Sequence, residues 1–200
     1  MTPGPSIAGI ILSGGASRRM GTPKALLRFQ NETFLDRLIR VLSAACEPII
    51  VVVGEHADPI RSGILRGREV LFTVNPDPER GMLSSLQCGL ALVPSNAEAA
   101  MFLPVDHPNI EALTIETLAD RFRGERAPVT VPTYAGEHGH PVCIARPLIE
   151  ELLALPAEAK ASDVIHRHVR QTSYVEVLDQ AVVTDVDDPK AYADLLARQQ

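Results

Sequence analysis

The chain has 200 residues, of which 46% are hydrophobic, and its formal net charge is -6. This length and hydrophobicity are sufficient for a sizeable buried core, so we expect one domain over residues 1–200. The acidic balance argues against nucleic acid as a partner, because binding to a phosphate backbone requires an excess of Lys and Arg.

The sequence carries no sign of secretion or of a membrane segment. No apolar run reaches the ~18 residues of a spanning helix, and residues 1–6 lack the positive start of a signal peptide. Cys46, Cys88 and Cys143 are an odd set without a C-x-x-C pair. They favour apolar thiols in a reducing compartment over disulfides or a zinc site. We therefore expect a cytoplasmic protein with no membrane partner.

The first predicted element is a strand over residues 7–12, a continuous apolar run typical of a strand buried on both faces of a parallel sheet. In the loop that follows, Gly14, Gly15 and Gly21 allow positive φ and a close approach of the backbone to a ligand. The N–H groups of such a loop, at the end of a strand, converge on an anion. Basic residues accompany it: Arg18, Arg19, Lys24 and Arg28. We predict a polyphosphate-binding loop.

Two common phosphate-binding loops are excluded by spacing. A P-loop requires Gly-Lys-Ser/Thr five residues after its first glycine, whereas Met20 stands five residues after Gly15 and no lysine follows Gly21 directly. The dinucleotide fingerprint G-x-G-x-x-G is also absent.

Hydrophobic periodicity predicts the remaining elements in chain order. The predicted helices are 34–42, 60–65, 82–92, 114–122, 148–155, 164–169 and 191–196, and the predicted strands are 48–53, 70–74, 99–105, 128–131, 142–144, 174–177 and 182–183. Strands and helices alternate over the first ~120 residues, which predicts a three-layer, Rossmann-like α/β fold: a mostly parallel sheet with helices on both faces. The C-terminal third loses this alternation, so we expect a mixed edge or a small hairpin there.

Polar side chains follow three of the predicted strands. Because the carboxyl ends of parallel strands meet at one edge of the sheet, we expect Ser13, Asp106 and the loop that begins at Asn75 to line one crevice. Lys24 is a point charge that can neutralise a phosphate, although a single lysine is more often a surface residue. Arg19 can bind phosphate oxygens with two donors, whereas we expect Arg18 to face solvent.

Asp106 ends the apolar run 101–105 and precedes His107-Pro108. A carboxylate beside a phosphate-binding loop is a hard oxygen ligand for Mg²⁺. The alternative is an aspartate that only caps the turn before the proline. We assign no chemical role to His107, which we interpret as a turn residue.

Several blocks resemble the MobA-like nucleotidyltransferases, the molybdenum cofactor guanylyl- and cytidylyltransferases and their relatives. Residues 7–24 are similar to L-x-(A/G)-G-x-S-x-R-M-G-x-x-K, and residues 104–108 to P-x-D-x-P. Residues 81–90 resemble G-M-x-S-S-L-x-x-G-L, and residues 139–142 resemble the G-H-P-V that faces the acceptor. Residues 184–192 depart in part from D-I-D-T-P-E-D-(L/Y). Together these blocks cover most of the chain.

The resemblance implies a fold like that of the nucleotide-diphospho-sugar transferases and a Mg²⁺-dependent reaction. An NMP would pass from CTP or GTP to a phosphorylated acceptor, most simply molybdopterin, with release of pyrophosphate. The nucleotide-binding residues would be Leu12, Ser13, Gly14, Gly15, Lys24, Gly81, Ser84 and Ser85, with Lys24 and Arg19 in catalysis. The metal ligands would be Asp106 and one of Asp185 and Asp187.

Alternatives remain open within this assignment. Ser84 and Ser85 can instead satisfy the backbone of their own helix, and Asp187 or Asp188 can instead cap the last helix. Gly14-Gly15 is like the guanylyl branch, whereas the blocks from Gly81 and Gly139 are like the cytidylyl branch, so CTP is favoured and GTP is the alternative.

Two other functions compete with this one. One is a sugar- or polyol-phosphate nucleotidyltransferase with a different acceptor. The other is a nucleotide-binding chaperone for a molybdoenzyme partner that has lost turnover. The presence of Lys24, Arg19 and Asp106 together favours an enzyme, since a non-catalytic descendant would not need them.

Overall fold

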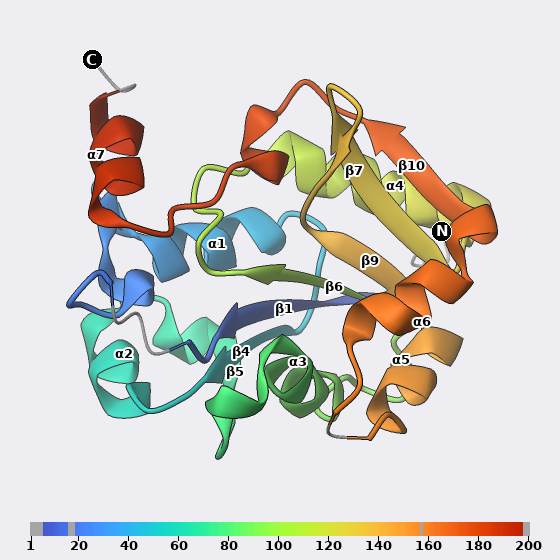
Figure 1. Ribbon diagram of the computed structural model, residues 1–200, viewed down its shortest axis with the longest axis horizontal. Helices are drawn as coiled ribbons and strands as arrows, with labels where there is room; N and C mark the ends of the chain where they lie inside the picture. Colours follow the sequence, from blue (N-terminus) through green and yellow to red (C-terminus); the bar gives the residue numbers. More distant parts are fainter. Residues whose placement is uncertain (1–5, 16–18, 157, 198–200) are drawn as a thin grey trace.

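The computed structural model describes residues 6–15, 19–156 and 158–197, and within them the chain forms a central eight-stranded sheet between helices (Figure 1). The strands of this sheet are β1 Ile7–Ser13, β4 Ile49–Val53, β5 Val70–Val74, β6 Ala99–Pro104, β7 Val129–Tyr134, β8 Glu137–His138, β9 Val142–Ala145 and β10 Thr172–Glu176. Two short strands, β2 Arg28–Phe29 and β3 Glu32–Thr33, form a separate hairpin.

The strand order is β10-β7-β9-β6-β1-β4-β5, with β8 added on β7. Strands β6, β1, β4 and β5 are parallel, and Ile11 of β1 is in register with Leu103 of β6 and Val51 of β4. Strand β9 is antiparallel to both β6 and β7, while β10 is parallel to β7. The predicted mostly parallel sheet and its mixed edge are confirmed. The carboxyl ends of β6, β1, β4 and β5 therefore lie at the same edge of the sheet.

Helices cover both faces of the sheet (Figure 1). They are α1 Phe34–Leu42, α2 Ala57–Gly63, α3 Met82–Leu90, α4 Ala112–Glu125, α5 Arg146–Leu153, α6 Ala161–Arg167 and α7 Pro189–Ala197. In the view of Figure 1, α1 and α4 lie above the sheet, and α3, α5 and α6 lie below it. Alternate residues of a strand point to opposite faces, so the wholly buried β1 contributes to both layers.

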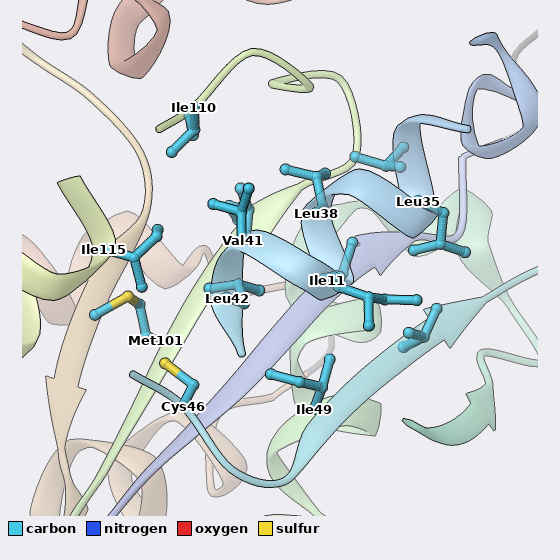
Figure 2. Close-up of a cluster of buried hydrophobic side chains, with 14 of the residues drawn as sticks. Ile11, Leu35, Leu38, Val41, Leu42, Cys46, Ile49, Met101, Ile110 and Ile115 are labelled. Carbon is cyan, nitrogen blue, oxygen red and sulfur yellow. The ribbon is translucent and has the colours of Figure 1, made fainter. Parts of the chain in front are cut away.

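Two apolar clusters match these two layers. Ile11 of β1 packs with Leu38 of α1 and Ile115 of α4, and Figure 2 shows α1 lying across the sheet at this cluster. On the opposite face, Ile10 packs with Leu86 of α3 and with α5. Burying both faces of the central strands fixes their register, because a shift by one residue would exchange the two sets of side chains.

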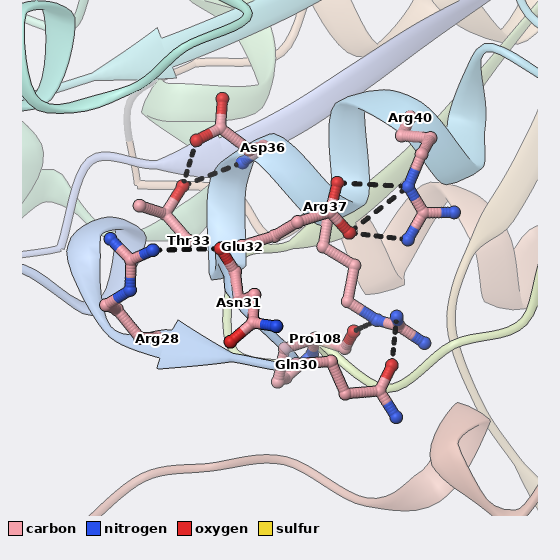
Figure 3. A network of polar contacts seen from close by, with 9 residues as sticks. All are labelled: Arg28, Gln30, Asn31, Glu32, Thr33, Asp36, Arg37, Arg40 and Pro108. Carbon is pink, nitrogen blue, oxygen red and sulfur yellow. Dashed lines mark hydrogen bonds and ion pairs between the residues drawn. The ribbon is translucent and has the colours of Figure 1, made fainter.

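The N-terminus of α1 shows how the sequence sets the local geometry. Thr33 caps the helix: its Oγ1 accepts from the N–H of Asp36 at 3.0 Å and donates to the carboxylate of Asp36 at 2.8 Å (Figure 3). Threonine is among the residues preferred at the N-cap, because its hydroxyl satisfies an N–H group of the first turn. In the same region, Nε of Arg37 donates to the carbonyl oxygen of Pro108 at 2.7 Å, which connects α1 to the turn after β6.

Two predicted elements differ from the structure. The helix predicted over 60–65 ends at Gly63, because the N–H groups of Leu65 and Arg66 donate to the buried Asp36 carboxylate instead of continuing the helix. The strand predicted at 182–183 is part of a 3-10 helix, Gln180–Val183. Its first turn is capped by the side chain of Asp179, which accepts from the N–H of Ala181.

Among the described residues, none of the helices has the length and apolar character required to cross a lipid bilayer.

Candidate active site

A pocket of about 510 Å³ lies at the carboxyl ends of β1 and β6. Its lining combines the end of β1, the loop after it, the start of α3, the end of β6 and the segment before α7. The lining residues are Leu12, Ser13, Gly14, Gly15, Arg19, Pro23, Lys24, Ile60, Pro78, Glu79, Gly81, Met82, Ser85, Pro104, Val105, Asp106 and Asp187. The volume falls within the range of small-molecule sites.

The loop after β1 is packed against its neighbours at two glycines. A Cβ on Gly14 would lie 2.8 Å from Oγ of Ser85, which starts the second turn of α3. A Cβ on Gly54, directly after β4, would lie 2.5 Å from the carbonyl oxygen of Gly14. Backbone atoms cannot yield as a flexible side chain can, so the position of the loop depends on the absence of a side chain at Gly54.

Gly54→Ala tests whether this loop position matters. We expect the new methyl group to displace the carbonyl of Gly14 and lower kcat/KM for nucleotidyl transfer by ~10²-fold, since misplaced binding groups are costly in catalysis. Steady-state kinetics with varied nucleotide would measure the effect. Gly124→Ala is the matched control, because apart from its own helix backbone nothing in the structure lies within 4 Å of the added Cβ. Equal kinetics for the two variants would contradict the prediction.

The start of α3 forms another wall of the pocket. Gly81 has φ +90°, a conformation that glycine adopts readily, and it has no side chain with which to cap the helix. The N–H groups of a first turn favour an anionic or polar ligand. Ser85 lines the pocket, whereas Ser84 is outside the lining and donates its Oγ–H to the carbonyl of Gly81. The bond of Ser84 therefore matches the alternative in which the serine hydroxyl satisfies the backbone at the start of its own helix.

Asn75 supports this wall of the pocket through hydrogen bonds to two serines of α3. Its side chain is buried, and Nδ2 donates to Oγ of Ser84 at 2.8 Å and to Oγ of Ser85 at 3.0 Å. The loop that begins at Asn75 was expected to line the crevice, and its residues Pro78, Glu79 and Gly81 do so. Asn75 itself is outside the lining and orients the two serine hydroxyls.

At the centre of the charged part of the site, Nζ of Lys24 lies 3.0 Å from Oδ2 of Asp106 and 2.6 Å from Oδ1 of Asp187. The Lys24 side chain is 13% exposed. These three residues come from the loop after β1, the end of β6 and the segment before α7, so the fold unites groups that are 82 and 163 residues apart.

The ionisation of these groups is coupled. Burial lowers the pKa of the Lys24 ammonium, but its hydrogen bonds and charge interactions with Asp187 and Asp106 outweigh burial and raise the pKa above its ordinary value. The hydrogen bond from Lys24 is the main cause of the lowered pKa of the Asp187 carboxyl. Both groups are therefore charged across the neutral range.

Of the other basic residues predicted for this site, those that the structure describes lie further from its charged centre than Lys24 does. Arg19 lines the pocket with Nη1 3.7 Å from Oδ2 of Asp187, and its side chain is 72% exposed. Arg28 is outside the pocket lining and donates to the carbonyl of Asn31 in the β2–β3 hairpin. Arg18, expected to face solvent, lies outside the described residues.

The two aspartates proposed for the C-terminal metal position are separated by the structure. Asp187 lines the pocket with Asp106. Asp185 is exposed and lines a different hollow, with Pro108 and Leu195. Of the two alternatives, only Asp187 reaches the charged centre.

The donor set fits a hard divalent cation. Oδ2 of Asp106 and Oδ1 of Asp187 both lie within 3.0 Å of the same ammonium nitrogen, so the two carboxylates converge on one point. Carboxylate oxygens are the ligands that Mg²⁺ and Mn²⁺ prefer. In the described parts of the chain, no cluster of three or more His, Cys, Asp or Glu side chains could hold a metal. The protein would thus supply two carboxylates, and substrate phosphates and water would supply the other ligands.

A pair of histidines, which was not predicted from the sequence, lies beside this centre. His107 is buried, with Nδ1 3.1 Å from the carbonyl oxygen of Ala181 and Nε2 4.0 Å from Oδ1 of Asp106. Its ring centroid lies 5.1 Å from that of His140. Ile60 and Met82 also line the pocket and were not among the predicted site residues. Nothing in the segment around Ile60 marks it as facing a ligand, whereas Met82 lies in the block 81–90 that was expected at the site.

The environment of His140 predicts a pH dependence of stability. Burial, assisted by the charge of His107 and opposed by that of Asp106, lowers the pKa of His140 to about 4 from an ordinary value of 6.5. The unfolded chain therefore binds a proton below pH 6.5 that the folded protein rejects until about pH 4. This lowers the free energy of unfolding by about 2 kcal/mol between pH 7.5 and pH 5.

Urea unfolding of the wild type and of His140→Gln at pH 7.5 and pH 5 would measure this effect. We expect the variant to lose about 2 kcal/mol less than the wild type over that range. His166→Gln, at an exposed site on α6, is the matched control. Identical losses in wild type and His140→Gln would contradict the assigned pKa.

Comparisons with known proteins place this geometry in context. Residues 9–172 match the family model described as the MobA-like NTP transferase domain. The molybdenum cofactor cytidylyltransferase of Escherichia coli is 25% identical over 180 residues, which cover 90% of each chain. A probable molybdenum cofactor guanylyltransferase of Bacillus cytotoxicus is 33% identical over 122 residues, 60% of this chain and 59% of the relative.

Solved structures agree with the fold. The crystal structure of Rv0371c from Mycobacterium tuberculosis has a TM-score of 0.84 at 30% identity, with 98% of this chain and 100% of that chain covered. A crystal structure of Rv0371C in complex with manganese has a TM-score of 0.80 at 27% identity and covers 96% of this chain and 98% of that one.

Proposed function

Because the chain belongs to the MobA-like NTP transferase family and is a nucleotidyltransferase, we propose that it transfers an NMP from CTP or GTP to the terminal phosphate of molybdopterin, releasing pyrophosphate. The observation that carries this proposal is the position of the Lys24 ammonium between Asp106 and Asp187, in the lining of a pocket that also includes Gly14, Gly15 and Gly81. This arrangement suits transfer of a phosphoryl group, in which catalysis is mainly positioning and charge stabilisation.

Each part of the pocket has a proposed role. The N–H groups of residues 13–15 bind the triphosphate, and the start of α3 binds the polar part of the nucleoside. Lys24 and Arg19 offset the negative charge that develops at the transferred group. Asp106 and Asp187 would hold a divalent cation, Mg²⁺ or Mn²⁺, which when bound supplies positive charge to the phosphate oxygens.

The chain requires no nucleophile or general base of its own. The attacking group is a phosphate monoester of the acceptor, which is already anionic at neutral pH. It attacks the α-phosphorus of the nucleotide in line, a new P–O bond forms, and the bond to the β-phosphate breaks with pyrophosphate as the leaving group. The protein's contribution is the alignment of two anions that would otherwise repel each other.

CTP is the preferred nucleotide in this proposal. The match to the cytidylyltransferase extends over 90% of each chain, and the blocks at Gly81 and Gly139 resemble that branch. Gly14-Gly15 and the match to the guanylyltransferase support GTP as the alternative.

Pyrophosphate release tests the proposal. Purified protein with Mg²⁺ or Mn²⁺ would be given CTP, GTP, ATP or UTP, each with and without molybdenum-loaded molybdopterin. We expect release with CTP, and only when the pterin is present. Release with GTP and with none of the other nucleotides would assign the enzyme to the guanylyl branch instead. Nucleotide binding without release would redirect the search to sugar and polyol phosphates, or to a non-catalytic partner of a molybdoenzyme.

A further inference from the structure

Asp187 is not part of the central sheet, and it reaches the site through a segment between β10 and α7. We call residues 179–188 the C-terminal strap. The strap is held to the rest of the protein at several points. The carboxylate of Asp179 accepts from the N–H of Glu111 at 2.9 Å and from Oγ1 of Thr114 at 2.8 Å, which fixes its first residue on α4.

The middle of the strap contacts the loop before β9. The N–H of His140 donates to the carbonyl oxygen of Val182 at 2.9 Å. A Cβ on Gly139 would lie 2.3 Å from the same oxygen, so the two backbones are in close contact. This packing fixes the distance between the strap and the loop before β9.

The turn after β6 is hydrogen-bonded to the strap at two residues, Val186 and Ala181. The carbonyl oxygen of Asp106 accepts from the N–H of Val186 at 2.8 Å, directly before Asp187. Five residues earlier, the carbonyl oxygen of Ala181 lies 3.1 Å from Nδ1 of His107. A carbonyl can only accept, so this geometry places the proton on Nδ1.

Among the described residues, the His107 bond is the one hydrogen bond to the strap that a side chain of this turn supplies. His107 is 7% exposed and Ala181 is 6% exposed. The same carbonyl also accepts from the N–H of Thr184 at 3.3 Å, within the strap itself. Removing the imidazole donor therefore leaves only this longer bond and takes away the link between the carbonyl and the turn after β6, in a poorly solvated place where a lost hydrogen bond is costly. The strap can recover a second donor for that carbonyl by moving toward water.

We propose that His107 is a positioning residue whose Nδ1–H holds the strap at Ala181, so that the Asp187 carboxylate lies opposite Asp106. Its relevance to catalysis rests on the proposed function, in which those two carboxylates hold the divalent cation. The positioning itself concerns only this chain's own backbone, and it can be measured without nucleotide, acceptor or metal.

A pair of matched variants isolates the donor. Asn places its amide nitrogen near the position of the imidazole Nδ1, whereas Gln places it near Nε2, out of reach of the Ala181 carbonyl. We therefore compare His107→Asn with His107→Gln. Both variants carry a side-chain amide in place of the imidazole, so they differ mainly in where the amide nitrogen lies. Two readouts are taken: hydrogen exchange of the amides of residues 180–187 in the metal-free protein, and the affinity for Mn²⁺ by paramagnetic resonance titration.

We expect His107→Gln to speed exchange in the strap by about tenfold or more while exchange in β1 stays at the wild-type rate, and to weaken Mn²⁺ binding by ~10–100-fold, the usual effect of losing a group that orients a metal ligand. His107→Asn should restore both. Unchanged strap exchange in His107→Gln would overturn the proposal, whatever the metal affinity.

Asp187→Asn separates this proposal from the proposed function. If strap exchange responds to His107 as expected but Asp187→Asn binds Mn²⁺ like the wild type, the positioning role stands and the metal assignment fails. If Asp187→Asn loses Mn²⁺ binding while both His107 variants keep wild-type binding and exchange, the metal assignment stands and the positioning role is overturned.

Discussion

Asp106→Asn is expected to lower kcat for nucleotidyl transfer by about 10³-fold at saturating nucleotide. The substitution keeps the size of the side chain and removes the negative charge that Lys24 contacts at 3.0 Å. If Asp106 holds the cation, losing this ligand removes several kcal/mol of charge stabilisation in the transition state, and about 4 kcal/mol corresponds to 10³-fold in rate. Pyrophosphate release would be measured over a range of Mn²⁺ concentrations, with the thermal midpoint recorded to show that the variant folds.

The pair Asp187 and Asp185 supplies the controls for this experiment. Asp187→Asn should lower kcat in the same direction, because its carboxylate converges with that of Asp106 on the same point. Asp185→Asn should leave the rate at the wild-type level, since that exposed side chain lines a different hollow. A large loss in Asp185→Asn, or wild-type turnover in Asp106→Asn, would contradict the metal assignment.

The sequence was sufficient for those parts of the fold that local physics determines. The run 7–13 is buried on both faces because every residue in it is apolar or small, and the glycines after it mark a turn at a strand end. Thr33 and Asp36 form a cap through bonds within one helical turn. The convergence of Ser13 and Asp106 follows from parallel strand pairing, which the strand–helix alternation predicted.

The parts that the sequence did not determine depend on distant contacts. Asp185 and Asp187 stand two residues apart in an irregular segment, so no periodicity assigns their directions. The assignment comes from the bond between the N–H of Val186 and the carbonyl of Asp106. His107 looked like a turn residue because its partner, Ala181, is 74 residues away. The end of α2 was misplaced for the same reason, since Asp36 lies about 30 residues before the N–H groups that it binds.

Substitution of Lys24 is expected to cause the second large loss of activity. Lys24→Met keeps the length and the apolar stem of the side chain and removes the ammonium. We expect kcat to fall by ~10²–10³-fold, corresponding to ~3–4 kcal/mol, the cost of losing one electrostatic contact to the developing charge. KM for the nucleotide should change less than kcat, because the N–H groups of residues 13–15 remain in place. Single-turnover kinetics would separate the chemical step from binding.

The same variant makes a prediction about stability that a catalytic effect alone would not produce. Lys24 lowers the pKa of Asp187, so this pair stabilises the folded protein above the ordinary pKa of an aspartate, and the contribution is lost as pH falls through the lowered folded value. The pKa of Lys24 is raised, so on the alkaline side the contribution is lost as pH rises through that folded value. The difference in unfolding free energy between the wild type and Lys24→Met should therefore be largest near neutral pH and shrink at both extremes.

Lys190→Met is the matched control for both measurements, because it removes an ammonium that is 85% exposed and paired with Asp194 on α7. It should keep wild-type turnover and show a small stability change, since exposed ion pairs contribute little. If Lys24→Met turned over like Lys190→Met, Lys24 would have no part in the chemistry. If its stability difference were flat with pH, the ion pair with Asp187 would not persist in solution. A large rate loss together with a pH-dependent stability loss would instead mean that one ammonium both holds the two carboxylates together and stabilises the transferred phosphoryl group.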